Sequence, residues 1–484
     1  MKLKRPEISY NAIRWFTAIL IFVCTMVGLL TIQRHVIYYQ EQHHLFLYTR
    51  DYFYHTLHWE GLMTYIGAFM VQFYYYPWLG AAIIAAMLAC IYLMVESVIF
   101  RLSGRRDFVQ IGAACSVALY FTLDDVNETP AIMAVCFMGL GIIWIAVIVI
   151  FRNRNNETLK KVMTSKQSMI PLFLAFVIPA VGFLIEYKHY NVDERKMLMA
   201  EKAIKNGDWD RALAITDAYL VSGMPNKLMY YLRHIALAQK GELINHLFDF
   251  PQKMGIGSLA FPWKRNTRET EHGHWVHEVT GDINVAHHWV FEAMTVWGET
   301  AQHLTDLGYY NVALGRPKVA LKFANRLKKS LFYRKEADKI IRQAKGEEPV
   351  SLRYAVPDSV TQVWENIVDF QPNLMQNYLA DPENHISRQY LIASLLLKNN
   401  LNALMPLLNL DDMRCKPVRE AIALYTLLPN AKPLGEFGLE YDPETQNEFY
   451  RFYELYKKNR MPELMAKYKN TYWYYFFVLS KPSK

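Results

Sequence analysis

Cysteine is scarce in this chain, and its placement excludes a disulfide scaffold. Only five cysteines occur in 484 residues. Four of them, Cys24, Cys90, Cys115 and Cys136, lie in apolar stretches, where a free thiol behaves as a small hydrophobic side chain. Cys415 stands alone in the rest of the sequence, so no internal disulfide can form there. No CxxC or Cys/His framework for a metal is present either.

The common catalytic signatures are missing as well. The sequence contains no H-E-x-x-H, Walker loop, G-x-S-x-G or G-x-G-x-x-G motif. Its formal net charge is +8, but the basic residues form no single stripe and many flank apolar runs, which argues against nucleic acid as a partner. We therefore expect neither a cofactor nor a metal.

Charge is nearly absent from long runs in the first two-fifths of the chain. A membrane-spanning helix needs roughly 20 mostly apolar residues, and a charge at its centre costs about 2.5–3.5 kcal/mol. Five segments fit, at residues 12–33, 78–100, 108–123, 130–151 and 168–186, of which the third is the shortest. The first has a basic start and no A-x-A cleavage site, so we interpret it as a retained anchor.

Residues 40–76 are interpreted as interfacial or re-entrant helices. The run GLMTYIGAFMVQFYYY at 61–76 is apolar but short, and Pro77 separates it from the next span. Loop charges favour five spans, because one side then receives most basic residues. These are Lys2, Lys4, Arg5, Arg14, Arg101, Arg105, Arg106, Arg152, Arg154, Lys160, Lys161 and Lys166. We expect a multi-pass protein of a bacterial inner (cytoplasmic) membrane, with a cytoplasmic N-terminus and a periplasmic C-terminal domain.

The first external loop, Tyr38 to Trp59, mixes aromatic, histidine and acidic residues. Its apolar residues recur at helical spacing, which favours an amphipathic helix on the membrane surface, in contact with membrane lipid. One alternative is a partner-docking surface. Another is a lipid-linked substrate site, loosely similar to those of lipid-sugar glycosyltransferases, in which carboxylates hold a metal or act as a base. Its candidate catalytic residues are Glu41, Asp51, Asp124 and Asp125.

A repeat with a helical period begins near residue 191. A glycine is followed five residues later by a small residue at Gly207/Ala212, Gly281/Ala286 and Gly315/Ala320, and Gly241 marks a degenerate unit. The glycine permits a tight turn between two helices, and the alanine lets the second helix pack closely on the first. Gly207 to Gly241 and Gly281 to Gly315 are each 34 residues apart, the period of the tetratricopeptide repeat.

The fold class predicted for the whole chain is all-α. A transmembrane helix bundle would occupy residues 1–190, tetratricopeptide-like repeats 191–346, and a further helical-repeat region 347–484, with a break within 347–357. Stacked repeats form a solenoid whose concave groove commonly binds a peptide or protein. The alternative for this solenoid is a purely structural role, packed against the membrane bundle.

The sequence EHGHWVHE at 271–278 holds the densest set of potential metal ligands. His274 and Glu278 are four residues apart, as a helical metal pair would be. The segment also opens the helix that leads to Gly281, and Trp275 and Val276 resemble packing positions. A polar helix face is therefore the preferred interpretation, and no metal site is predicted.

Four motifs of the chain carry a resemblance to a known family. They are QFYYYP at 72–77, GDINVAHHWVFEA at 281–293, LKKSLFYRKEA at 327–337 and TYWYYF at 471–476. On these, the chain resembles DUF6057, a family of multi-pass membrane proteins of unknown function from Bacteroidota. The resemblance implies a bacterial inner-membrane protein with a repeat-containing tail, and it implies no activity.

Two functions are therefore expected. The first is a membrane-anchored, non-enzymatic scaffold whose periplasmic solenoid binds another envelope protein. The alternative is an enzyme, or an enzyme subunit, acting on a lipid-linked substrate, such as a glycan carrier, at the outer face of the inner membrane.

Overall fold

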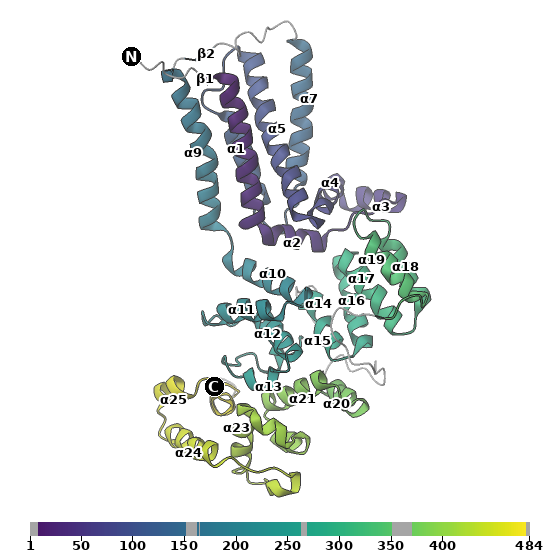
Figure 1. The fold of residues 1–484 in the computed structure, drawn as a ribbon, viewed down its shortest axis with the longest axis vertical. Coiled ribbons are helices and arrows are strands. Elements are labelled where there is room, and N and C mark those ends of the chain that lie inside the picture. The colour runs from purple at the N-terminus through teal and green to yellow at the C-terminus, as the bar shows by residue number, and fades with distance from the viewer. Residues whose placement is uncertain (1–7, 152–161, 164, 263–268, 351–369, 481–484) are drawn as a thin grey trace. The chain divides into compact units, whose positions relative to one another are not determined.

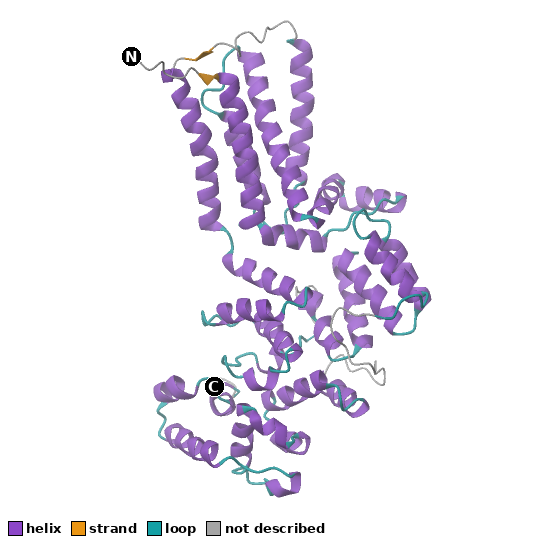
Figure 2. Cartoon of the chain, in the orientation of Figure 1, coloured by secondary structure: helices purple, strands orange, loops and turns teal. Residues whose placement is uncertain are grey.

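The computed structural model describes residues 8–151, 162–163, 165–262, 269–350 and 370–480. Helices dominate it, which confirms the all-α prediction; the described residues add one short antiparallel pair, β1 (Ile8–Ser9) with β2 (Val162–Met163) (Figure 2). The chain divides into two compact units. The first comprises Met1–Arg195, Glu299–Leu304 and Asn325–Asp338, and the second comprises Lys196–Gly298, Thr305–Ala324 and Lys339–Lys484.

Long apolar helices form the body of the first unit. Among the described residues, four are long and apolar enough to cross a membrane: α1 (Tyr10–Thr31), α5 (Pro77–Ser103), α7 (Ala131–Ile150) and the Met169–His189 part of α9 (Ser165–His189). Figure 1 shows them side by side. Each overlaps one of the spans predicted from the charge-free runs.

The third predicted span, 108–123, forms only a short helix. It consists of α6 (Ile111–Tyr120) and the 3-10 turn η3 (Phe121–Leu123). Its ends nevertheless meet opposite ends of α1: the Tyr10 hydroxyl donates to the Asp107 carbonyl at 3.2 Å, and Gln33 Nε2 donates to Asp124 Oδ1 at 2.9 Å. The segment therefore runs along α1 from one end to the other, because its non-helical ends and its 3-10 turn rise further per residue than an α-helix does.

Short helices lie between α1 and α5. They are α2 (Arg34–His43), α3 (Arg50–His55), the π-helical η1 (Thr56–Glu60), α4 (Leu62–Val71) and the 3-10 turn η2 (Gln72–Tyr75). The predicted 61–76 segment corresponds to α4 and η2 and is too short to cross a bilayer. A Cβ on Gly67 would overlap the Thr129 side chain, so α4 packs tightly against the loop before α7.

Small residues bring the bundle helices together. A Cβ on Gly112 of α6 would lie 3.0 Å from the Tyr92 carbonyl of α5, and one on Gly182 of α9 would lie 2.7 Å from Val117 of α6. Helices in lipid gain little from the hydrophobic effect, so such close backbone approach is how they hold to one another.

The second unit is built from helical hairpins. The first hairpins are α10 (Val192–Lys205) with α11 (Trp209–Leu220), α12 (Lys227–Gln239) with α13 (Leu243–His246), α15 (His274–Val279) with α16 (Ile283–Trp297), and α17 (Ala301–Ala313) with α18 (Pro317–Leu327). Their turns carry Gly207, Gly241, Gly281 and Gly315, with φ of +70°, +77°, +86° and +67°. Ala212, Ala286 and Ala320, on the second helices, are fully buried.

One hydrogen-bond pattern recurs at these turns. At the first, the Gly207 N–H donates to the Ile204 carbonyl and the Asp208 N–H to the Ala203 carbonyl, which is the Schellman motif. Asp208 then caps the next helix by accepting from the Arg211 N–H. A few residues therefore end one helix and begin the next.

The same turn continues in the C-terminal part with asparagine in place of glycine. Asn399 (φ +55°) lies between α21 (His385–Leu397) and α22 (Leu401–Leu404), and Asn459 (φ +51°) between α24 (Pro443–Lys457) and α25 (Met461–Tyr468). Asparagine tolerates the left-handed region better than most residues. The remaining elements there include α20 (Phe370–Ala380), α23 (Lys416–Tyr425) and α26 (Tyr472–Tyr474).

Buried polar side chains connect the later helices to the earlier turns. Gln389 accepts from the Leu243 N–H and donates to the Ala238 carbonyl, and the Thr280 carbonyl accepts from Ser387 Oγ and Asn384 Nδ2. The ranges predicted as 191–346 and 347–484 therefore fold together over most of their length. The predicted break at 347–357 lies partly outside the described residues.

Candidate functional site

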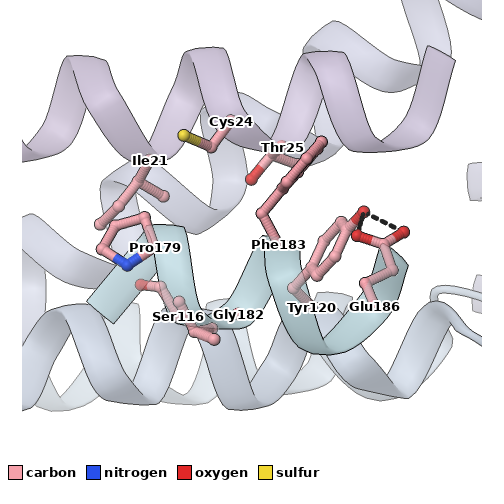
Figure 3. A pocket seen from close by; sticks show the side chains of 10 residues that line it. Ile21, Cys24, Thr25, Ser116, Tyr120, Pro179, Gly182, Phe183 and Glu186 are labelled. Carbon is pink, nitrogen blue, oxygen red and sulfur yellow. Dashed lines mark hydrogen bonds between the residues drawn. The ribbon is translucent and has the colours of Figure 1, made fainter. Parts of the chain in front are cut away.

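Polar side chains inside the membrane bundle are the first place to search for chemistry. A small cavity of about 30 Å³ lies among α1, α6 and α9 (Figure 3). Figure 3 shows Ser116 and Tyr120 of α6 facing Cys24 and Thr25 of α1 across it, with Glu186 of α9 beside Tyr120. A space of this size holds about one water molecule.

Glu186 is fully buried and pairs with Tyr120. The Tyr120 hydroxyl lies 2.7 and 2.6 Å from the two carboxylate oxygens and donates to them (Figure 3). Gly28 of α1 makes room for this pair, since a Cβ there would collide with the Tyr120 hydroxyl. An acidic group within a span is costly unless it is paired, so this bond joins α6 to α9.

A second buried pair joins α1 to α5. Arg14 Nε lies 2.9 Å from Glu96 Oε2, and the Glu96 side chain is only 1% exposed. Arg14, which the sequence analysis counted among the basic residues of one side, lies in the second turn of α1. Both residues lie within two turns of the ends of their predicted spans. A search for charges at the centres of spans therefore does not detect this pair.

The four candidate acidic residues of the first unit have separate surroundings. Asp124 accepts from Gln33, while Asp125 accepts from the Asn127 backbone and side chain at 2.8 and 3.0 Å. Asp51 lies in the first turn of α3 and is exposed, and Glu41 accepts a hydrogen bond from the Tyr333 hydroxyl. No group of three or more potential ligands exists among the described residues. The structure does not assemble these carboxylates into one site.

The histidines of residues 271–278 are buried, which corrects the interpretation of a polar helix face. His272, His274 and His277 each face a different carboxylate, from Glu201, Asp306 and Asp282, at 3.2, 3.4 and 3.9 Å. Glu278 accepts from the Tyr310 hydroxyl at 2.5 Å. Burial lowers the pKa of His277 to about 3, so its ring is neutral at physiological pH.

A polar cleft of about 360 Å³ lies in the second unit. Three helices, α23, α24 and α25, and residues 471–473 line it. The charged residues lining the cleft are Lys416, Arg419, Glu420, Asp442, Glu444, Glu448 and Lys467. Three cations and four carboxylates thus line one opening, and sequence reasoning identified none of them.

Glu420 lies at the base of the cleft and is 1% exposed. Its Oε2 accepts from the Tyr472 N–H at 2.7 Å, and its backbone carbonyl accepts from Trp473 Nε1 at 2.7 Å. It therefore anchors the aromatic TYWYYF segment at 471–476. Burial raises the pKa of Glu420 to about 7. The only sequence signal was an acidic residue among the apolar positions of α23.

Glu448 also lines the cleft, and its pKa is shifted in the opposite direction to that of Glu420. It accepts from Lys467 Nζ and the Tyr468 hydroxyl, each at 2.7 Å, and from Arg451 at 3.0 Å. Hydrogen bonds from Lys467 and Tyr468 lower the pKa of Glu448 to about 2. At neutral pH Glu448 is therefore firmly ionised, whereas Glu420 is close to its titration point.

We expect Tyr120→Phe to destabilise the membrane bundle by about 1–3 kcal/mol, because the buried Glu186 carboxyl loses its donor. The unfolding of the detergent-solubilised chain by increasing amounts of sodium dodecyl sulfate measures this change. Tyr187→Phe is the matched control, since Tyr187 is 61% exposed. Equal stability of both variants would mean that the hydroxyl does not support the carboxyl.

We expect Glu420→Gln to stabilise the second unit at pH 8 and to have little effect at pH 5. The folded pKa is raised from 4.5 to about 7, so the stability of the wild type is complete below pH 4.5 and falls as pH rises through 7. The loss is up to about 3 kcal/mol. Melting temperatures of the two proteins across this pH range measure the effect.

Glu448→Gln is the control with the opposite sign. Its lowered pKa adds stability that is present above pH 4.5 and is lost as pH falls toward 2. This variant should therefore lower the melting temperature at pH 8. A pH-independent effect of Glu420→Gln would contradict the raised pKa.

Comparison with known proteins identifies a family for the chain. The sequence model of the family of unknown function DUF6057 matches residues 9–164 and 108–479, two overlapping segments. No curated protein and no solved structure matches the chain. The matched residues include the membrane bundle, the hairpin turns and the TYWYYF segment. The chain belongs to DUF6057, a family of unknown function.

Proposed function

We propose that this protein is a membrane-anchored scaffold whose second unit binds a segment of another envelope protein in the cleft between α23, α24 and α25. The cleft carries this proposal. It offers side-chain donors and acceptors around a cavity of about 360 Å³, which can pair with the backbone and side chains of a peptide.

The hairpin architecture supports a binding role. Hairpins joined by left-handed turns stack into tetratricopeptide-like solenoids, and such solenoids commonly present a surface for an extended peptide. The 34-residue spacing of Gly207 to Gly241 and of Gly281 to Gly315 agrees with that class. We include a solenoid of this type in the proposal.

The charges of the cleft indicate the chemistry of its partner. Lys416 is 60% exposed, while Arg419 and Asp442 lie 3.8 Å apart on the rim. A polypeptide with alternating acidic and basic side chains can pair with both kinds of group and use the cleft residues to fix its register.

The pairing of buried charges supports an anchoring role for the bundle. Arg14 pairs with Glu96 and Tyr120 with Glu186. Internal pairs of this kind stabilise helix packing. The alternative enzyme on a lipid-linked substrate lacks a comparable observation, because Glu41, Asp51, Asp124 and Asp125 have separate surroundings.

We also propose that the protein lies in a bacterial inner membrane, with its N-terminus in the cytoplasm and its second unit in the periplasm. Helices α1, α5, α7 and α9 and the traversing segment 107–124 support five passes. The concentration of basic residues on one side of these passes supports the orientation.

A photo-crosslinking residue at Thr445, inside the cleft, should give a discrete adduct with one polypeptide in intact cells. The adduct should disappear when Lys416→Glu and Arg419→Glu are added, because two of the three cations of the cleft are then reversed. Lys458 is the control position, since it lies outside the cleft and is 65% exposed. Identical products from both positions, or an adduct that survives charge reversal, would refute binding in the cleft.

Orientation has a separate test. A reporter that is active only in the periplasm should work when fused after Lys484 and should be silent when fused after Arg106, which follows α5 on the opposite side of the bundle. The two positions control for each other's expression. The reverse outcome would contradict the proposed topology, and it would not bear on the proposal that the cleft binds a polypeptide.

A further inference from the structure

Helices α5 and α9 each bury one acidic side chain, and only the one on α5 has a cation beside it. Glu96 of α5 lies 2.9 Å from Arg14 Nε. Glu186 of α9 is 0% exposed and has no basic partner within the part of the chain that the structure describes. An ionised carboxyl there would be an unpaired charge away from water, which is strongly unfavourable. A carboxylic acid that keeps its proton avoids this cost.

The surroundings of Glu186 add no compensating positive charge. Tyr120 of α6 and Cys24 of α1 line the cavity beside it, and Asp124, one turn beyond Tyr120, is acidic. Glu186 itself lies in the last turn of α9, where the free carbonyl groups of the helix end disfavour an anion. The titratable residues that follow on α9 are exposed: Tyr187, Lys188 and His189. The packing around the carboxyl therefore favours its neutral form.

The two contacts of the Tyr120 hydroxyl are best satisfied by two hydrogens. The hydroxyl oxygen lies 2.7 Å from Glu186 Oε1 and 2.6 Å from Oε2 (Figure 3), and both distances are typical of a hydrogen bond. The hydroxyl carries one hydrogen, which can point at only one of the two oxygens with the preferred angle above about 150°. A protonated carboxyl supplies the second hydrogen, because it donates to the tyrosine oxygen from one of its oxygens and accepts from the hydroxyl at the other.

Water lies close to this buried pair. Glu186 is three residues from the end of α9, which is roughly 4.5 Å along the helix axis. Asp124, one turn beyond Tyr120, is exposed. The cavity of about 30 Å³ beside Glu186 has room for about one water molecule, which can pass a proton on (Figure 3). A proton held by this carboxyl is therefore near enough to the aqueous surface to exchange.

We propose that Glu186 is a proton-binding site of the membrane bundle, which holds one exchangeable proton at neutral pH and shares it with Tyr120. Acidic side chains within membrane spans are typical members of proton relays. A metal cation is a poorer occupant, because the Tyr120 hydroxyl already contacts both carboxyl oxygens and most of the cavity wall is apolar. Release of the proton would leave an unpaired charge where α6 meets α9, so proton binding also stabilises the packing of these two helices. This inference is independent of the polypeptide-binding cleft.

Infrared difference spectroscopy of the full-length protein, in a detergent without carbonyl groups, detects the proton directly. At pH 7 we expect Glu186→Gln to lose the carbonyl band of one protonated carboxyl. In the wild type this band should shift on transfer to D2O, because the bound proton exchanges with water. Glu128→Gln is the matched control, since Glu128 is exposed and its replacement should remove carboxylate bands instead.

Two results of this measurement would overturn the proposal. Loss of carboxylate bands in Glu186→Gln would show that the side chain is ionised. A protonated band that does not shift in D2O would show a proton that is trapped in the fold and does not bind reversibly. Exchange of sodium for potassium in the buffer should leave the band unchanged, and a loss of the band in sodium alone would make a metal cation the occupant.

Tyr120→Phe tests whether the proton is shared with the tyrosine. This variant should keep the protonated band but move it to higher frequency, because the carbonyl group of Glu186 then accepts no hydrogen bond from the ring. Tyr187→Phe is the control, since Tyr187 is 61% exposed and should leave the band in place. A band at the wild-type frequency in Tyr120→Phe would refute the shared pair.

Discussion

Pairing of polar groups inside an apolar bundle is the constraint on which the first unit depends. Hydrocarbon offers no partner for a carboxylate or an amide, so each must find one within the protein. Tyr10 with Asp107 and Gln33 with Asp124 fix both ends of segment 107–124 along α1. Tyr120 then connects this segment to Glu186 of α9. A short, irregular segment is thereby held in register along α1 by internal hydrogen bonds.

The second unit obeys a different constraint, which is set by the backbone. A helix that reverses direction within a few residues needs one residue in the left-handed region, where Cβ is unfavourable. Glycine meets this need at residues 207, 241, 281 and 315, and asparagine at 399 and 459. Side chains of later helices then bond to these turns, as Ser387 does to the Thr280 carbonyl. These turns therefore reverse the chain within each hairpin and also accept hydrogen bonds from later helices.

Sequence patterns predicted what depends on local composition. Charge-free runs located α1, α5, α7 and α9, and the all-helical class followed from them and from the helical periodicity. The glycine criterion could not follow the hairpins past residue 346, because asparagine performs the same role there. Glu420 escaped notice, and the burial of His277 was not predicted, because the burial of each is created by distant segments, such as 471–476 for Glu420. The sequence also gave no sign that Asp124 pairs with Gln33 and not with Asp51, because such side-chain partners are brought together only by the tertiary fold.

Two cavities of opposite chemistry follow from these two constraints. In the cleft, α23 to α25 face water, so Glu448 and Lys467 can remain ionised and pair with each other at 2.7 Å. In an apolar cavity of the first unit, Met87 of α5 and Phe137 of α7 face a space where any polar atom would be unpaired. The chemistry of each cavity therefore follows from the solvent in which the helices around it fold.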